Sequence, residues 1–498
     1  MEVQFGKTML SCLDMPVREI RCGEQTQEIR VPEGMPDIGR VLASWGQPIL
    51  RGKEWSRDEI SFSGGMMVWV MYAPEDGTQE RILETWVPFQ MHWDLPEDTP
   101  EGSIRLRCLP RFVDGRSVSP RKIMVRCGMS VMTEVFTSKT VDVFSPEEAP
   151  NEVELLRNTY PIRLPIESGE KTFLVDEELI LPDSVPQAEQ LLYYRLDPVI
   201  TDRKVLSNKL VFRGNGNLHI LYRSEGGQLY GWTFDLPFSQ YAELETEHGS
   251  DAQADLALMV TNLEAELDDE GYIRLKAGVA GQYLITDKQM VGIVEDAYSP
   301  NRELQIRTET LTLPAVLESR RENIYGEQTI SAQANLAADI SFLPDFPRQR
   351  RTEDGIEMET PGLFQVLYYG EDGVLRSGTG KWENRQHLNA DKESRVLAVP
   401  GPTEPQAMAG NGQILAKTDL PMEYITTTLQ QFPMVTGLEL GAQRTPEPNR
   451  PTLLLRRAGE QRLWDIAKDS GSTMDAIRRA NGLAEEPMPN QMLLIPVR

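Results

Sequence analysis

Histidines are the side chains best suited to acid–base chemistry near neutral pH, and the four in this chain are scattered. They are His92, His219, His248 and His387. His219 lies in a strand-like run, but the matching positions of two similar segments hold Trp69 and Gln365. The chain also lacks a Gly-x-Ser-x-Gly turn, which presents the nucleophilic serine of many hydrolases. We therefore expect structural or exposed roles for the histidines and predict that the protein is not an enzyme.

Two glycine-rich segments come near the pattern of a phosphate-binding loop. The segment 378–382, Gly-Thr-Gly-Lys-Trp, lacks the upstream glycine and the Ser or Thr after the lysine that would hold Mg²⁺. The segment 214–217, Gly-Asn-Gly-Asn, leads into a strand rather than into the start of a helix. We therefore predict no cofactor.

Four cysteines, at positions 12, 22, 108 and 127, form no Cys-x-x-Cys pair and have no histidine at ligand spacing. Cys108 and Cys127 lie in apolar, strand-like runs. Because cysteine is often a small buried hydrophobe, we expect both in a core and predict no metal site. A disulfide or a zinc site is the alternative.

The charge and the N-terminus restrict the class of protein. A formal charge of −25 argues against sequence-independent binding to nucleic acid and to anionic lipid. Residues 1–20 carry charges and no long apolar core, so they do not resemble a secretory signal. No run approaches the roughly 18 apolar residues of a spanning helix. We expect no transmembrane segment and a protein that stays in the compartment where it is made.

The strands that would position a functional site belong to a sequence pattern that is repeated along the chain. Residues from 31 onward match residues from 181 onward without gaps, at an offset of 150, as the matching of Pro32 with Pro182 illustrates. Further matched pairs are Pro36 with Pro186, Leu42 with Leu192, Phe62 with Phe212, Gly64 with Gly214, Tyr72 with Tyr222 and Gly77 with Gly227. A third copy shares the segment 364–373 and an upstream anchor, Gly-Glu-Gln/Lys-Thr, which begins at residues 23, 169 and 326. The period is too long for a solenoid unit, so each copy is expected to be a domain.

Each copy is predicted to be β-rich. Apolar and polar residues alternate in Ile60-Ser61-Phe62, and the shared segment ends in Asp-Gly or Gly-Gly, a hairpin signal. The glycine pairs Gly64/Gly65 and Gly214/Gly216 indicate a bulge or a bend. Proline-led segments at 35–42 and 185–192 are expected to form short helices.

The C-terminal residues have the order strand, helix, helix, strand. Apolar runs at 452–455 and 492–496 flank a first helix that opens at Leu463, and Ser472-Thr473-Met474-Asp475 forms a capping box for the second. The second helix ends at Asn481-Gly482, where a left-handed residue is needed. With Leu-Trp-x-Ile-Ala, Ala-Asn-Gly-Leu and Leu-Leu-Ile-Pro in order, this segment resembles the LysM family.

The copies before it, with the Gly-Glu-Gln/Lys-Thr anchor, Leu-Pro-x-x-x-Pro and Tyr-x-x-x-x-Gly, resemble the SPOCS domain of spore-coat morphogenesis proteins. This resemblance implies a non-enzymatic coat assembly factor, made in the cytoplasm of the mother cell and located at the forespore surface. It also implies that the LysM domain binds a protein partner, the SpoIVA-type ATPase of the coat basement layer, with other coat proteins as further partners.

The predicted fold is mainly β, with two or three tandem sandwich-like domains followed by a βααβ LysM domain. Clusters of proline and charge place the boundaries. The domains are 1–145, 152–295 and a divergent third at 302–440, then a proline-rich linker at 441–451 and the LysM domain at 452–498.

In glycan-binding LysM domains, the turn before the first helix and the segment after the second form the sugar groove. By resemblance the groove positions here are Glu460, Gln461, Arg462, Leu463, Asn481, Gly482 and Leu483. The long side chains at 460–462 stand where the family has Gly-Asp-Thr, which favours a protein ligand over glycan.

Two roles are open for Trp464: it anchors a partner protein, or it packs inside the small module. Five arginines make the tail locally basic: Arg456, Arg457, Arg462, Arg478 and Arg479. They form a solvated face or steer the tail toward an acidic partner. Two other functions stay open, a peptidoglycan or N-acetylglucosamine-binding protein of the wall or cortex and a hydrolase with an acid/base pair in a cleft.

Overall fold

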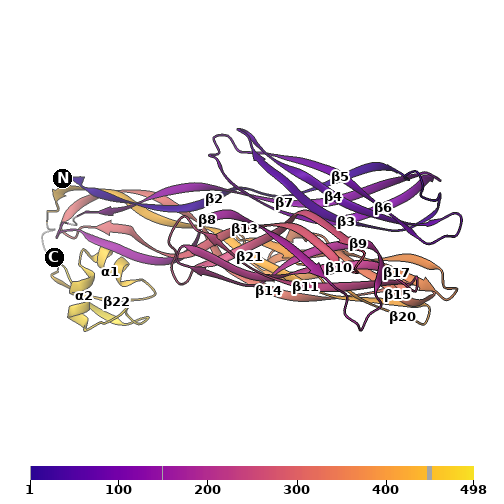
Figure 1. The fold of residues 1–498 in the computed structure, drawn as a ribbon. Coiled ribbons are helices and arrows are strands. Elements are labelled where there is room, and N and C mark those ends of the chain that lie inside the picture. Colours follow the sequence, from indigo (N-terminus) through magenta and orange to yellow (C-terminus); the bar gives the residue numbers. More distant parts are fainter. Residues whose placement is uncertain (1, 148–149, 446–450, 498) are drawn as a thin grey trace.

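The computed structural model describes residues 2–147, 150–445 and 451–497, and it shows an elongated bundle of long strands with a small helical module at one end (Figure 1). The predicted class, a mainly β chain with a βααβ end, is confirmed. Residues 148–149 and 446–450, in the first predicted joint and in the linker, lie outside the described residues. The start of the linker belongs to a strand, because β21 continues to Gln443.

Two sheets are built from the first third of the chain. A meander has the order β3-β4-β5, and a long hairpin with a third strand has the order β2-β7-β6. The strands are β2 (Phe5–Arg30), β3 (Ile38–Trp55), β4 (Glu59–Pro74), β5 (Arg81–Asp94), β6 (Gly102–Ser119) and β7 (Lys122–Pro146).

The second third repeats this topology, with a meander in the order β11-β10-β9 and a hairpin sheet in the order β12-β13-β8. Its strands are β8 (Glu154–Leu179), β9 (Ala188–Leu206), β10 (Lys209–Ser224), β11 (Leu229–Glu243), β12 (Gln253–Leu267) and β13 (Ile273–Tyr298).

The last third is a variation on the same plan. Its long hairpin is β14-β21, and two short strands, β19 and β20, pair with β21 where the other copies have one. The strands are β14 (Arg302–Ser331), β15 (Ala334–Pro344), β16 (Arg348–Arg351), β17 (Gly355–Gly370), β18 (Leu375–Asn389), β19 (Arg395–Pro400), β20 (Gln406–Gly410) and β21 (Gln413–Gln443). The prolines at 400, 402 and 405 separate β19 from β20, since proline cannot donate to a ladder. We call residues 5–146, 154–298 and 302–443 the first, second and third repeats.

Strand pairing in the described residues stays within each repeat, apart from the short β1 (Glu2–Val3), which pairs with β21. The repeats nevertheless share cores. Trp45 of the first repeat stacks on Tyr193 of the second, with ring centroids 4.9 Å apart, and Leu375 of the third joins the same cluster. Nearer the termini the three hairpins pack on one another through Cys12, Ile162 and Leu311 and their neighbours. The molecule is therefore one body with three similar parts.

The expected helices at 35–42 and 185–192 are wrong. A turn lies just before each segment, closed by the amides of Met35 and Val185 on the carbonyls of Pro32 and Pro182, and the segments themselves run into β3 and β9. The buried hydroxyl of Tyr72 donates to the carbonyl of Pro36 at 3.0 Å, and Tyr222 makes the same bond to Pro186 at 2.9 Å. These tertiary bonds hold the turn, and the prolines and tyrosines that match between the copies are their partners.

The matched glycines lie where two strands approach closely. A Cβ on Gly64 would stand 2.4 Å from the carbonyl oxygen of Ile49, and one on Gly214 would stand 2.0 Å from that of Val199. Register shifts lie beside both positions, so the predicted irregularity is confirmed. Cys108 and Cys127 are buried as expected, and burial raises the pKa of each thiol to about 12.

Candidate functional site

The C-terminal module is a two-stranded sheet with two short helices. Its elements are β22 (Leu453–Arg457), α1 (Leu463–Ser470), α2 (Met474–Asn481) and β23 (Met492–Pro496), with β22 antiparallel to β23. Alternate residues of β23, Leu493 and Ile495, are fully buried together with Ile466 and Ile477 from the helices. Leu463 is part of the same core, so this predicted groove residue faces inward.

The caps of α2 differ in one detail from the expected capping box. The side chain of Thr473, not Ser472, accepts a hydrogen bond from the amide of Ala476 at 3.1 Å. The hydroxyl of Ser472 instead donates to the carbonyl of Pro496 on β23. Gly482 ends α2 in the left-handed conformation with φ 65°, as the sequence predicts.

The turn before α1 presents three exposed side chains. Gln461 accepts a hydrogen bond from Arg456 at 2.6 Å, and Arg462 pairs with Asp465 at 3.1 Å. Glu460 is exposed beside them. On the other side of the predicted groove, Gly482 is exposed and Leu483 is half-buried against the core.

Hydrogen bonds within the module occupy much of the predicted groove. Glu486, from the loop after α2, accepts a bond from the amide of Leu463 at 2.7 Å and so joins the two sides. This carboxylate also satisfies a free amide at the positive end of α1. The Asn481 side chain exchanges two bonds with the backbone of Leu494, at 2.6 and 2.8 Å. Sequence reasoning missed Glu486, whose only signal was an acid in the loop that faces a helix start.

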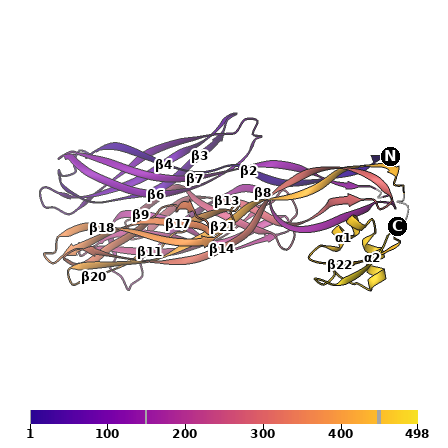
Figure 2. The same ribbon diagram turned by 180° about the vertical axis from the view of Figure 1, so that it is seen from behind.

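Trp464 packs against the tip of the second repeat. Its side chain is 2 % exposed, its ring meets that of Tyr298 edge-on at 4.8 Å, and its indole N–H donates to Asp296 at 2.8 Å. The ammonium of Lys468 pairs with the same carboxylate at 2.7 Å, and the Tyr298 hydroxyl donates to the carbonyl of Ser472. The view from behind shows the module against the same end of the bundle (Figure 2). Trp464 is therefore directed at the protein's own β13 rather than at solvent.

The outer face of the module's sheet is apolar and exposed. The exposed fractions are 53 % for Leu453, 66 % for Leu455, 48 % for Met492 and 40 % for Leu494. Their strands alternate so that the intervening residues are more buried, as expected for a sheet with one face on a core. We call these four residues the sheet face. Contiguous exposed apolar residues on a small domain commonly mark a protein-binding surface.

The tail arginines fall into two groups. Arg456, Arg462 and Arg479 each pair with an aspartate of the module. Arg457 lies at the end of β22 on the sheet-face side, and among the described residues it has no ion pair. Arg478 is partly buried. Three of the five arginines are thus paired within the module, whereas Arg457 and Arg478 have no ion pair among the described residues.

His219, the histidine singled out by the sequence, joins two repeats. Its Nε2 lies 2.8 Å from the buried Asp339 of β15, and its Nδ1 lies 3.1 Å from the hydroxyl of Thr233. An acid, a histidine and a hydroxyl in a row can activate a nucleophile. None of the three residues lines the cavity of about 300 Å³ that lies elsewhere between the repeats.

Residues 187–268 match the family model described as SipL, SPOCS domain. The matched segment covers β9 to β12, that is, the meander of the second repeat and the strand that follows it. The match supports a coat-related role in sporulation. No curated protein and no solved structure matches the chain.

No helix among the described residues is both long and apolar enough to span a membrane. In residues 2–147, 150–445 and 451–497, no group of three or more His, Cys, Asp and Glu side chains is arranged to hold a metal ion.

Proposed function

We propose that this protein is a non-enzymatic assembly factor of the spore coat, that its C-terminal module is a LysM domain, and that this module recruits a SpoIVA-type ATPase to the forespore surface. The three repeats, with boundaries at 1–145, 152–295 and 302–440, would form a body that other coat proteins contact. The family-model match supports the coat-related part of the proposal.

The observation that carries the recruitment role is the contrast between the two surfaces of the module. Across the groove that would receive glycan, Glu486 bonds to Leu463, and the polar atoms of the Asn481 side chain bond to Leu494, whereas the sheet face is apolar and exposed. Glycan recognition needs free polar groups, while burial of four apolar side chains favours a protein partner. Glu460, Gln461 and Arg462 flank the groove and would be rim contacts in either case.

Capture of the ATPase from sporulating cells tests the proposal. Full-length protein is compared with a chain truncated after residue 445 and with the double variant Leu455→Asp/Leu494→Asp. We expect both changes to reduce capture by at least about tenfold, because a charge on the sheet face cannot be desolvated in an apolar interface. Met408→Asp is the matched control, since Met408 is an equally exposed methionine on β20 of the body.

Equal capture by the truncated chain would overturn the role of the module. The same proteins are pelleted with peptidoglycan. Co-sedimentation of the full-length chain that Glu460→Ala weakens would instead favour the peptidoglycan or N-acetylglucosamine-binding function, because Glu460 is an exposed groove position.

A further inference from the structure

The hydrogen bonds at the two ends of the module's sheet show which way its backbone groups point. In an antiparallel pair, the N–H and C=O of one residue point to the same side, so residues alternately bond across the pair and point away from it. The amide of Val497 donates to the carbonyl of Thr452 at 3.0 Å, just before β22. The amide of Ala458 donates to the carbonyl of Gln491 at 2.8 Å, just after it. The even-numbered residues of β22 therefore bond to β23, and the odd-numbered residues direct their N–H and C=O outward.

The outer edge of β23 is covered by side chains of the module itself. Leu494 stands opposite Leu455, and both of its outward backbone groups bond to the side chain of Asn481, at 2.6 and 2.8 Å. The carbonyl of Pro496 accepts a bond from the hydroxyl of Ser472, and a proline has no amide hydrogen to donate. A further strand is therefore kept from pairing with β23.

The outer edge of β22 is open. Among the described residues, the outward backbone groups of Leu453, Leu455 and Arg457 have no hydrogen-bond partner. Such a row of unpaired N–H and C=O groups is a template on which another strand can pair. A sheet of only two strands also gains stability from a third strand. The module therefore offers one edge, and not the other, for pairing with a further chain.

The side chains beside this edge are two leucines and one cation. Leu453 and Leu455 belong to the sheet face and are 53 % and 66 % exposed. Arg457 projects on the same side of β22 and has no ion pair among the described residues. Its neighbour Arg456, on the opposite side, pairs with Asp469 at 3.5 Å. A strand that pairs with β22 therefore places its own alternate side chains beside two apolar groups and one uncompensated guanidinium.

The edge is accessible while the module is docked on the second repeat. The docking contacts come from α1, through Trp464 and Lys468, and Figure 1 shows α1 on the side of the module nearest the bundle. The exposed fractions of Leu453 and Leu455 are those in the docked chain. A partner therefore reaches β22 without displacing the module.

We propose that the module binds its partner by strand addition, in which an extended segment of the partner pairs with the outer edge of β22. In this mode of recognition the main-chain bonds supply affinity and the alternate side chains supply specificity. The segment carries apolar residues at two alternate positions, which cover Leu453 and Leu455, and a carboxylate at the next, which pairs with Arg457. This assignment rests on the proposed recruitment of a SpoIVA-type ATPase by the module, and it adds the chemistry of the segment that is bound.

Hydrogen exchange resolved to single amides tests the pairing, in the full-length chain alone and with the purified ATPase. In the free chain, the amides of Leu454 and Arg456 should be protected, whereas those of Leu453, Leu455 and Arg457 should exchange rapidly, because exchange requires an unbonded amide. Saturating ATPase should slow exchange at these three amides by at least about tenfold. The alternating pattern of the free edge would then become continuous along β22.

Two substitutions at one position separate the backbone from the side chain. Leu455→Pro and Leu455→Ala both reduce the apolar side chain, but only proline removes the outward amide. Proline is compatible with the module's own sheet, because this amide takes no part in the β22–β23 ladder. In calorimetric titrations with the ATPase, Leu455→Pro should bind at least about tenfold more weakly than Leu455→Ala. Circular dichroism verifies that both chains are folded.

Arg457→Glu tests the predicted carboxylate and leaves every backbone amide in place. It should weaken binding by about fivefold, because it removes one ion pair and adds a like-charge contact at the rim of the interface. Arg479→Glu is the matched control, since Arg479 is an exposed arginine of the same module that pairs with Asp475 on α2. The control should bind within about twofold of the unmodified chain.

The outcomes distinguish this assignment from the proposed function. A complex that requires the module but leaves exchange at residues 453, 455 and 457 unchanged would overturn strand addition and leave the recruitment role standing. Equal binding by Leu455→Pro and Leu455→Ala would do the same. A module that binds no ATPase would overturn both. Protection of the three amides in the concentrated chain without ATPase would assign the edge to a second copy of the chain, against the proposal.

Discussion

At the scale of single residues, Glu134 shows how far the environment controls a charge. Burial by itself raises the pKa of this carboxyl, but the guanidinium groups of Arg105, Arg18 and Arg107 outweigh it and lower the pKa from 4.5 to about 2. A carboxyl whose pKa is lower in the folded state stabilises the fold above its unfolded pKa. That contribution is lost as the pH falls toward the folded pKa.

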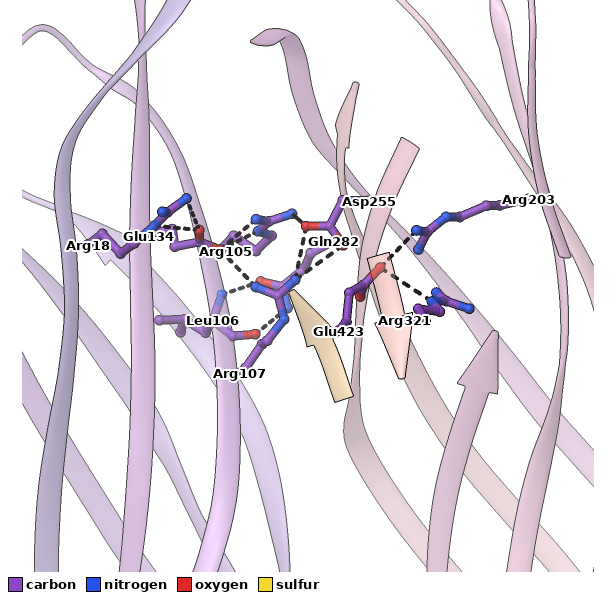
Figure 3. A network of polar contacts seen from close by, with 10 residues as sticks. All are labelled: Arg18, Arg105, Leu106, Arg107, Glu134, Arg203, Asp255, Gln282, Arg321 and Glu423. Carbon is purple, nitrogen blue, oxygen red and sulfur yellow. Dashed lines mark hydrogen bonds and ion pairs between the residues drawn. The ribbon is translucent and has the colours of Figure 1, made fainter. Parts of the chain in front are cut away.

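The first prediction follows from the lowered pKa of Glu134 in the folded state, where Arg18, Arg105 and Arg107 surround its carboxylate (Figure 3). Glu134→Gln should lower the free energy of unfolding at pH 7 by about 3–5 kcal/mol, because it leaves buried arginines without their counterion. The difference from the unmodified chain should shrink as the pH falls from about 4.5 to about 2, where Glu134 becomes protonated. Urea denaturation at several pH values measures both effects.

The control for this experiment is Glu19→Gln, which removes an exposed partner of Arg21 on the same repeat. It should change stability by no more than about 0.5 kcal/mol. A Glu134→Gln variant whose deficit is constant from neutral to acid pH would contradict the assignment of a lowered pKa.

At the scale of elements, the module is held on the second repeat by β13 and α1. Asp296 accepts bonds from Trp464 and Lys468, and the ring of Tyr298 covers the indole. The module that follows the proline-rich linker is therefore docked on the second repeat. Because the Asp296–Lys468 pair is partly exposed, the apolar contact of the two rings is the larger contribution.

Asp296→Ala should loosen this docking. With the acceptor gone, the indole N–H is left without its bond, and hydrogen exchange in α1 should speed up by about tenfold while exchange in β22 and β23 stays within a few-fold. Tryptophan fluorescence should report a more polar surrounding. Asp475→Ala, which removes the exposed partner of Arg479 on α2, is the control and should leave exchange in α1 unchanged. Unaltered exchange in Asp296→Ala would mean that the carboxylate does not hold the module.

Local sequence patterns predicted the helices and strands better than they predicted the contacts between them. Alternation and turn residues indicated the strands, and the spacing of apolar residues indicated both helices of the module. The segments at 35–42 and 185–192 were predicted wrongly because a proline can precede a strand as well as open a helix. The distant hydroxyls of Tyr72 and Tyr222, which bond to the proline carbonyls, are not visible in the local pattern. Glu486 and Asp296 could not be assigned to the site, since their bonds join residues far apart in the chain.

At the scale of the whole molecule, the three repeats form one body. The alternation of a strand shows that one face is buried but does not show which sheet covers it, so the sequence predicted tandem domains without their shared core. Trp45 and Tyr193, Arg105 and Asp255, and His219 and Asp339 each join two repeats. Arg105 and Asp255 stand at matching positions, 150 residues apart. The same position of the repeat is therefore positively charged in the first copy and negatively charged in the second.

Such shared packing predicts cooperative unfolding. Trp45 is 5 % exposed at the junction of the first and second repeats, so Trp45→Ala should cost about 3–5 kcal/mol. Hydrogen exchange should then show reduced protection in β9 and β10 of the second repeat as well as in β3 and β4. Trp55→Ala provides the comparison, because Trp55 packs against the core cluster centred on the first repeat and its loss should leave β9 and β10 protected. If Trp45→Ala instead lowered protection in the first repeat alone, the repeats would unfold as independent domains, and the shared core around Trp45 and Tyr193 would not couple them.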